Sequence, residues 1–179
     1  VGADGPVLPE LSGRSASFAD HLRRFPGDGP IPRHLVERAA ILFDDLCASA
    51  TERVVLHGDL HHDNILTAAE GRVSARHDEG RTEPERWLAI DPHGVVGDPG
   101  YEVGALLYNP GPGTADDTVL GLAESRIEQL ADSLGMPLDR VVAWGFVQGV
   151  LSEVWTFEGG ATTNTRALRL AERLSPMLK

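Results

Sequence analysis

One stretch of this chain has residue types and spacing suited to phosphoryl transfer, the string HGDLHHDNIL at residues 57–66. Phosphoryl transfer requires a carboxylate beside the attacking hydroxyl, ligands for the Mg²⁺ that bridges nucleotide phosphates, and rigid positioning of both. Asp59 and Asn64 follow the pattern Asp-x4-Asn, so one short loop can supply a base, Asp59, and an oxygen ligand, Asn64. Asp91 can supply a carboxylate oxygen, which suits a hard cation.

Two apolar runs must position these residues. Residues 54–56 precede the string and residues 87–90 precede Asp91, and both runs have the length and composition of short strands. The second run predicts a buried strand that presents Asp91 at its end. A segment of mixed charge separates Asn64 from Asp91, and it has to fold back as a hairpin or turn if the two are to meet.

The simplest alternative is a polar surface turn, because Gly, Asp, His and Asn are ordinary turn residues. From average residue usage, the four fixed positions of H-G-D-x4-N should occur by chance on the order of once in a thousand chains of this size. A surface turn also does not require a second acidic motif at the end of another strand. The pattern therefore favours a functional loop.

The strings HGDLHHDNIL and AIDPHGVVGDPGYEVGALLYNP resemble those of the aminoglycoside phosphotransferase family, and most closely its streptomycin and hydroxyurea kinase branch. The resemblance runs from about residue 30 to the end of the chain. It implies ATP and Mg²⁺ as cofactors and transfer of the γ-phosphoryl group to a hydroxyl of a small cationic molecule, an activity of antibiotic resistance. By position, Asp59 resembles the family's catalytic aspartate, Asn64 and Asp91 resemble its two metal ligands, and His57 would brace the loop.

The resemblance also implies the fold class, a mainly helical α+β fold that is the C-terminal lobe of a protein-kinase-like fold, with a small β-hairpin around the catalytic loop. Apolar periodicity agrees with this expectation, since it predicts several helices and only short strands. The predicted helices cover residues 17–25, 32–46, 102–108, 119–134, 137–155 and 163–174. The helix after Pro137 is apolar on nearly every face, which predicts a buried central helix.

Two features depart from the family pattern. Glu102 stands where the pattern usually has Asp after G-D-P, so the carboxylate that holds the catalytic loop from behind reaches one methylene further. A complete kinase also needs a glycine-rich loop and a phosphate-binding lysine ahead of the catalytic loop, and residues 1–53 contain no lysine. We therefore expect residues 33–179 to form the catalytic lobe and residues 1–32 to be a linker or the start of that lobe. The N-terminal lobe of the same protein would be a partner of this catalytic lobe, and the catalytic lobe alone should be a poor kinase.

Composition narrows the partners. The formal net charge of −11 argues against nucleic acid or an anionic membrane and favours a cationic ligand. Cys47 is the sole cysteine and cannot form an internal disulfide, which indicates a reducing, cytoplasmic location. We find neither an apolar run long enough for a membrane span nor a secretory leader in the sequence.

Three residues near the end of the central helix are candidates for substrate binding. Glu153, Trp155 and Glu158 precede the break at Gly159 and Gly160, and they could form an acidic wall for an amine-bearing substrate. In the alternative interpretation, Trp155 belongs to the core and both glutamates are solvated.

Two other functions remain open. Imidazole and carboxylate groups at short spacing are common zinc ligands, so the chain could be a zinc-dependent hydrolase. The cluster in that case would be His57, His61, His62 and Asp63, with His93 as a further ligand. A zinc site leaves the role of Asn64 unexplained. The third possibility is a non-catalytic binding module that keeps the kinase lobe without its activity.

Overall fold

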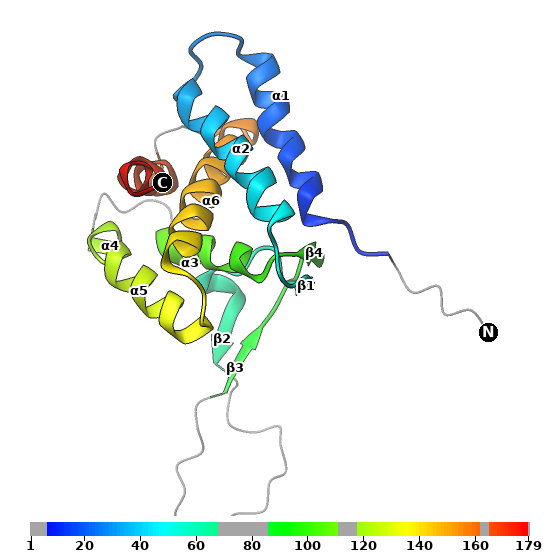
Figure 1. Cartoon of the computed structure of the whole chain (residues 1–179), viewed down its shortest axis with the longest axis vertical. Helices are drawn as coiled ribbons and strands as arrows, with labels where there is room; N and C mark the ends of the chain where they lie inside the picture. Colours follow the sequence, from blue (N-terminus) through cyan, green and yellow to red (C-terminus); the bar gives the residue numbers. More distant parts are fainter. Residues whose placement is uncertain (1–6, 68–85, 111–117, 162–164, 179) are drawn as a thin grey trace, which may run out of the picture.

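The computed structural model describes residues 7–67, 86–110, 118–161 and 165–178. Within these ranges the protein is a mainly helical α+β structure with two small antiparallel sheets, as the sequence predicts (Figure 1). The α-helices are α1 (Ala16–Arg24), α2 (Arg33–Ala48), α3 (Val103–Tyr108), α4 (Thr118–Gly121), α5 (Ala123–Leu134), α6 (Leu138–Glu158) and α7 (Arg166–Leu174). The strands are β1 (Val54–Leu56), β2 (Ile65–Thr67), β3 (Trp87–Ala89) and β4 (Val95–Gly97). Four 3-10 helices complete the order, η1 (Leu11–Ser15), η2 (His62–Asn64), η3 (Pro99–Glu102) and η4 (Ser175–Met177).

Helix α6 lies at the centre of the helical body, as its apolar composition predicts. It packs against α1, α2, α3, α5 and α7, and most of its residues from Val141 to Val154 are buried (Figure 1). The contact with α7 is close at Gly149, where an added Cβ would lie 2.6 Å from the carbonyl oxygen of Ala167. The central helix therefore requires a residue without a side chain at this crossing.

Local signals in the sequence mark the helix ends well. Pro32 occupies the N-cap of α2, where its fixed φ and missing N–H group cost the helix nothing. Gly135 ends α5 in the left-handed conformation, with φ 61°, and its N–H bonds back to the carbonyls of the last turn. Among the described residues no helix is long and apolar enough to cross a membrane.

The N-terminal segment belongs to the same core. Leu11 in η1, Phe18 in α1 and Ile31 before α2 are each exposed by 1% or less. The Phe18 ring packs edge-on against Phe43 of α2, with the ring centroids 5.8 Å apart. Leu11, Phe18 and Ile31 therefore pack into the same core as the helices that follow, while the division of the chain at residue 32 stays a prediction.

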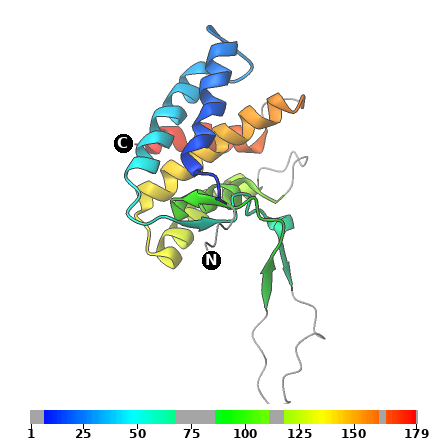
Figure 2. The same ribbon diagram turned by 90° about the vertical axis from the view of Figure 1, so that its right-hand side faces the viewer.

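The two sheets are nested in the sequence. Strand β1 pairs with β4, with Val54 opposite Gly97, while β2 pairs with β3, with Ile65 opposite Ala89. The β2–β3 hairpin projects away from the helices (Figure 2). The prediction of a buried strand is therefore wrong in one respect, because Trp87 and Leu88 of β3 are 58% and 55% exposed. In the part of the chain that the structure describes, this hairpin extends away from the helical body, which leaves Trp87 and Leu88 exposed.

Candidate active site

Two loops lie side by side between the sheets. We call residues 57–64 the Asp59 loop and residues 90–94 the Asp91 segment. The carbonyl of His57 accepts a hydrogen bond of 2.8 Å from the N–H of His93, and the N–H of Ile90 donates to the carbonyl of Asn64 at 3.0 Å. Antiparallel pairing of β1 with β4 and of β2 with β3 thus brings together two segments about thirty residues apart.

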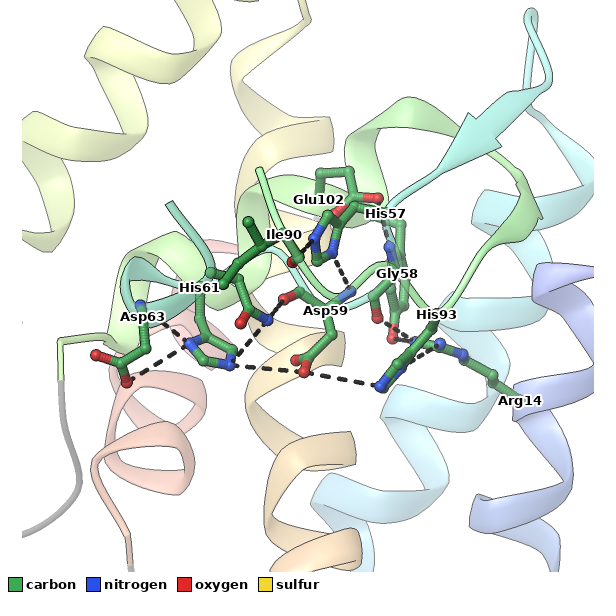
Figure 3. A network of polar contacts seen from close by, with 11 residues as sticks. Arg14, His57, Gly58, Asp59, His61, Asp63, Ile90, His93 and Glu102 are labelled. Atoms are coloured by element: carbon green, nitrogen blue, oxygen red, sulfur yellow. Dashed lines mark hydrogen bonds and ion pairs between the residues drawn. The ribbon is translucent and has the colours of Figure 1, made fainter. Parts of the chain in front are cut away.

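Asp59 lies at the surface between two imidazoles. Its side chain is 41% exposed, and its Oδ2 lies 3.5 Å from Nε2 of His61 and 3.9 Å from Nε2 of His93 (Figure 3). His61 is fixed from its other side, where its Nδ1 accepts from the N–H of Asp63 at 3.3 Å. A carboxylate that is partly exposed and oriented by neighbours can accept a proton from an incoming hydroxyl.

Asn64 is buried behind Asp59 and fixes the loop. Its side chain amide Nδ2 donates to the backbone carbonyl of Asp59 at 2.9 Å, and the residue is only 8% exposed. This contact uses the amide nitrogen and leaves Oδ1 as an acceptor or metal ligand. Asn64 is therefore held in one orientation relative to Asp59.

Asp91 occupies the same end of the β2–β3 hairpin. Its neighbour Ile90 is hydrogen bonded to Asn64, so Asp91 stands one residue beyond that pair. It is exposed, and it is the one described residue other than glycine with a positive φ, 57°. Left-handed backbone at an L-residue is strained and concentrates at functional sites, and Asp and Asn tolerate it better than most residues.

His57 braces the two loops against each other. Its Nδ1 accepts from the N–H of Asp59 at 3.3 Å, so in the neutral ring Nε2 carries the proton. That Nε2 donates to the carbonyl of Ile90 at 2.7 Å. Both ring nitrogens of His57 therefore bond to backbone groups, one in each of the two loops.

Glu102 lies behind the Asp59 loop at the end of η3. Its Oε1 accepts from the backbone N–H of Gly58 at 2.8 Å (Figure 3). Gly58 has φ 81°, a conformation that a residue with a side chain rarely adopts. The longer reach of Glu relative to Asp therefore still makes the contact with the loop.

The three candidate substrate residues occupy different environments. Glu153 is fully buried, and its carboxylate accepts from the N–H and hydroxyl of Thr165, at the start of α7. Trp155 is 38% exposed and donates from Nε1 to the hydroxyl of Ser17 at 3.0 Å. Glu158 is exposed at the end of α6. Glu153 thus anchors α7, and only Trp155 and Glu158 present surface to a substrate.

Two further residues support the loops, and the sequence marked only one of them. Arg14 donates from Nη1 to the carbonyl of Gly58 at 2.8 Å, although the two are 44 residues apart. Asp98, the acid of the G-D-P triplet, is buried, accepts from the N–H of Gly100 at 2.7 Å and forms an ion pair with Arg140. No local pattern marks an arginine as the partner of a distant carbonyl, whereas the G-D-P triplet did mark Asp98.

Burial changes the chemistry of groups around the loops. Removal from water raises the pKa of Tyr101 to about 12 and also raises the pKa of Tyr108. Burial, with a smaller contribution from Arg126, lowers the pKa of His62. The two phenols and His62 therefore stay neutral around neutral pH.

The described residues contain no group of three or more His, Cys, Asp or Glu side chains arranged to hold a metal ion. Both ring nitrogens of His57, which the zinc interpretation requires as a ligand, are occupied by backbone groups. The structure therefore does not favour the zinc hydrolase.

The sequence model of the family "Aminoglycoside/hydroxyurea antibiotic resistance kinase" matches residues 4–160 of the chain. The chain belongs to this family. The resemblance stated from the two sequence strings is thereby confirmed.

Curated relatives with known activities are similar over most of this chain. It is 28% identical over 172 residues to the streptomycin 6-kinase of Streptomyces glaucescens, a match that covers 95% of this chain and 48% of that protein. It is 31% identical over 125 residues to the streptomycin 3''-kinase of Klebsiella pneumoniae, covering 68% of this chain and 42% of that protein. The hydroxyurea phosphotransferase of Kitasatospora aureofaciens is 29% identical over 153 residues, covering 86% and 35% respectively. The chain thus spans half or less of these relatives' length, and no solved structure matches it significantly.

Proposed function

We propose that this chain is the catalytic lobe of an ATP- and Mg²⁺-dependent phosphotransferase that acts on a hydroxyl of a small, cationic, streptomycin-like molecule and thereby confers antibiotic resistance. The observation that supports the proposal is the pair of hydrogen bonds that Asn64 makes, from its side chain to the backbone of Asp59 and from its carbonyl to the N–H of Ile90, the residue before Asp91. Membership of the kinase family and the net charge of −11 support it.

The residues present fit a magnesium ion. Mg²⁺ prefers oxygen ligands and is usually bound through one or two protein groups together with water and substrate phosphates. Asn64 offers Oδ1, because its amide nitrogen is already used, and Asp91 offers an exposed carboxylate. When bound, the ion would neutralise the negative charge that develops on the phosphoryl group during transfer.

Asp59 would act on the acceptor. Its carboxylate orients the acceptor hydroxyl and takes its proton as the hydroxyl oxygen bonds to the γ-phosphorus and the bond to the β-phosphate oxygen breaks. The products are a phosphate ester and ADP, and the proton remains on Asp59 until it is released to water. The backbone of the Asp59 loop is fixed by Glu102 and Asn64, so the carboxylate is positioned before substrate arrives.

The rest of the site would come from outside the described residues. The one lysine in the sequence is Lys179, so we assign the phosphate-binding lysine and the nucleotide-covering sheet to a separate N-terminal lobe of the full-length protein. The requirement for ATP places the proposed reaction in the cytoplasm.

The proposal is tested by incubating full-length protein with Mg²⁺, ATP and a panel of aminoglycosides, hydroxyurea and simple alcohols, and by measuring ADP release and the phosphorylated product. Transfer to at least one hydroxyl compound is expected. ATP binding without transfer to any acceptor would instead identify a non-catalytic binding module. Zinc bound to the purified protein would support the zinc-dependent hydrolase.

The metal site has its own test. Asp91→Asn keeps a residue that tolerates the left-handed backbone and removes the charge. Because even support residues of metal sites are worth about 10- to 100-fold in affinity, the Mg²⁺ concentration for half-maximal rate should rise by more than about tenfold. An unchanged Mg²⁺ dependence would remove Asp91 from the metal site. Asp132→Asn, on the exposed face of α5, is the matched control.

A further inference from the structure

Arg14 connects the N-terminal segment to the Asp59 loop. It lies in η1, 44 residues before Gly58, and its Nη1 donates to the carbonyl of Gly58 at 2.8 Å and to the hydroxyl of Tyr101 (Figure 3). Tyr101 is buried and keeps its proton at neutral pH, because burial raises its pKa to about 12. Arg14 is therefore fixed by one rigid partner while it holds the loop.

Both the N–H and the carbonyl of Gly58 are hydrogen bonded to side chains. Glu102 accepts from its N–H at 2.8 Å, and Arg14 donates to its carbonyl. That carbonyl belongs to the peptide bond leading to Asp59, so its direction determines where the backbone of Asp59 starts. Gly58 has no side chain and can therefore adopt its φ of 81°, but it also has more backbone freedom than other residues. The contacts with Glu102 and Arg14 restrict that freedom.

Arg14 also reaches the imidazole beside Asp59. Its Nη2 lies 3.5 Å from Nδ1 of His93, whose Nε2 lies 3.9 Å from Oδ2 of Asp59. A guanidinium donates hydrogen bonds and cannot accept them, so Nδ1 of His93 must be the acceptor. In the neutral ring the proton then sits on Nε2, the nitrogen that faces Asp59.

Two aromatic rings hold the guanidinium in place. Its central carbon lies 5.0 Å from the centroid of the Tyr101 ring and 5.4 Å from that of Trp155. Trp155 is itself fixed by its hydrogen bond to Ser17. A lysine at residue 14 would keep the charge but not the planar fork that reaches the Gly58 carbonyl, the tyrosine and His93 at once.

We propose that Arg14 is a positioning residue for Asp59, which acts by fixing the Gly58 carbonyl and by holding His93 in the form that has its proton on Nε2. This inference rests on the proposed function only for its effect on turnover. The state of His93 can be measured whether or not an acceptor is known.

The test compares Arg14→Lys with the wild type in full-length protein. The rate constant kcat should fall about 10- to 100-fold, because small misplacements of a reacting group cost up to about 10²-fold, while the KM for ATP changes less than twofold. Arg23→Lys is the matched control, since Arg23 forms an exposed ion pair with Asp20 on α1, away from the site.

A spectroscopic readout separates positioning from a purely structural role. Two-bond ¹H–¹⁵N correlations of ¹⁵N-histidine protein, with His93 assigned through a His93→Asn variant, report which ring nitrogen carries the proton. The wild type and Arg23→Lys should show the proton on Nε2 of His93, and Arg14→Lys should show a mixture. An identical His93 signal in Arg14→Lys would overturn the proposal, even if the variant were less active or less stable. Failure of the wild type to phosphorylate any acceptor would overturn the proposed function and leave the His93 measurement to decide the role of Arg14.

Discussion

The contact between Glu102 and Gly58 leads to a quantitative prediction for Glu102→Ala. Gly58 is buried, and its N–H donates to Oε1 of Glu102 at 2.8 Å. Removing the carboxylate leaves a buried backbone donor without its partner, which costs about 1–3 kcal/mol. For a protein of this size each kcal/mol shifts Tm by about 2–4 °C, so Glu102→Ala should unfold roughly 2–12 °C below the wild type.

The assay is thermal and urea unfolding of the 179-residue chain, with Glu124→Ala as the matched control. Glu124 forms an ion pair of 3.0 Å with Arg173 in which both side chains are largely exposed. Exposed pairs contribute about 0–1 kcal/mol, so the control removes the same charge and the same atoms at small cost.

Glu102→Asp tests the extra methylene. The carboxylate retreats by about 1.5 Å, one carbon–carbon bond, so the hydrogen bond to Gly58 is lost unless the backbone moves. The free energy of unfolding of Glu102→Asp should lie between that of the wild type and that of Glu102→Ala. If Glu102→Ala is no less stable than Glu124→Ala, the hydrogen bond to Gly58 does not hold the Asp59 loop.

Three further outcomes follow from the packing and the pKa shifts. Gly149→Ala should destabilise the chain by about 1–3 kcal/mol in urea unfolding, because the new Cβ meets the carbonyl of Ala167 at 2.6 Å. Gly121→Ala is the control and should not destabilise the chain, because the space around Gly121 is open. Equal effects of the two changes would contradict the close crossing of α6 and α7. Burial, aided by a nearby arginine, lowers the pKa of His21 below its usual 6.5, so the unfolded state binds more protons and stability should fall as pH drops below about 6.5. That slope should be shallower in His21→Phe, and an unchanged slope would exclude His21 as its source. Burial raises the pKa of Cys47 to about 11, so about one thiol in a thousand is ionised at pH 8. Iodoacetamide should therefore label Cys47 far more slowly in the folded chain than in the urea-unfolded chain. Similar labelling rates would show that the folded chain does not protect this thiol.

The parts of the fold that depend on local signals were predictable. The strand at residues 54–56, the proline that begins α2 and the glycine that ends α5 lie where the sequence places them. The buried α6 was also predicted, because a helix that is apolar all round has to be covered on all sides.

Other parts depend on contacts that sequence patterns do not carry. The apolar run of β3 predicted burial, yet whether an apolar strand is covered depends on what packs on its faces. As a charged residue, Glu153 was expected at the surface, but it is buried, and the N–H and hydroxyl groups of Thr165 both donate to its carboxylate. The Gly- and Pro-rich composition of residues 1–32 suggested a linker or the start of the lobe, and it did not indicate that Leu11 and Phe18 are buried in the core.

The candidate site divides in the same way. Asp59 and Asn64 were found through their spacing within one loop, because a short loop brings them together without help from the rest of the fold. Arg14 comes from a distant segment, and its place beside Gly58 and His93 depends on how η1 packs. Spacing along the chain cannot report a contact that only tertiary structure creates.

Whether Asp59 is the base for transfer to the acceptor hydroxyl can be decided from the rate of product formation by full-length Asp59→Asn. Its carboxylate is partly exposed and, among the described residues, makes only long contacts with two histidines, so the change should alter stability by less than about 0.5 kcal/mol. With an acceptor identified, kcat should fall by about 10² to 10⁴, the usual contribution of a positioned general base, while Asp132→Asn retains full activity. A rate for Asp59→Asn equal to that of the wild type would show that Asp59 is not the base.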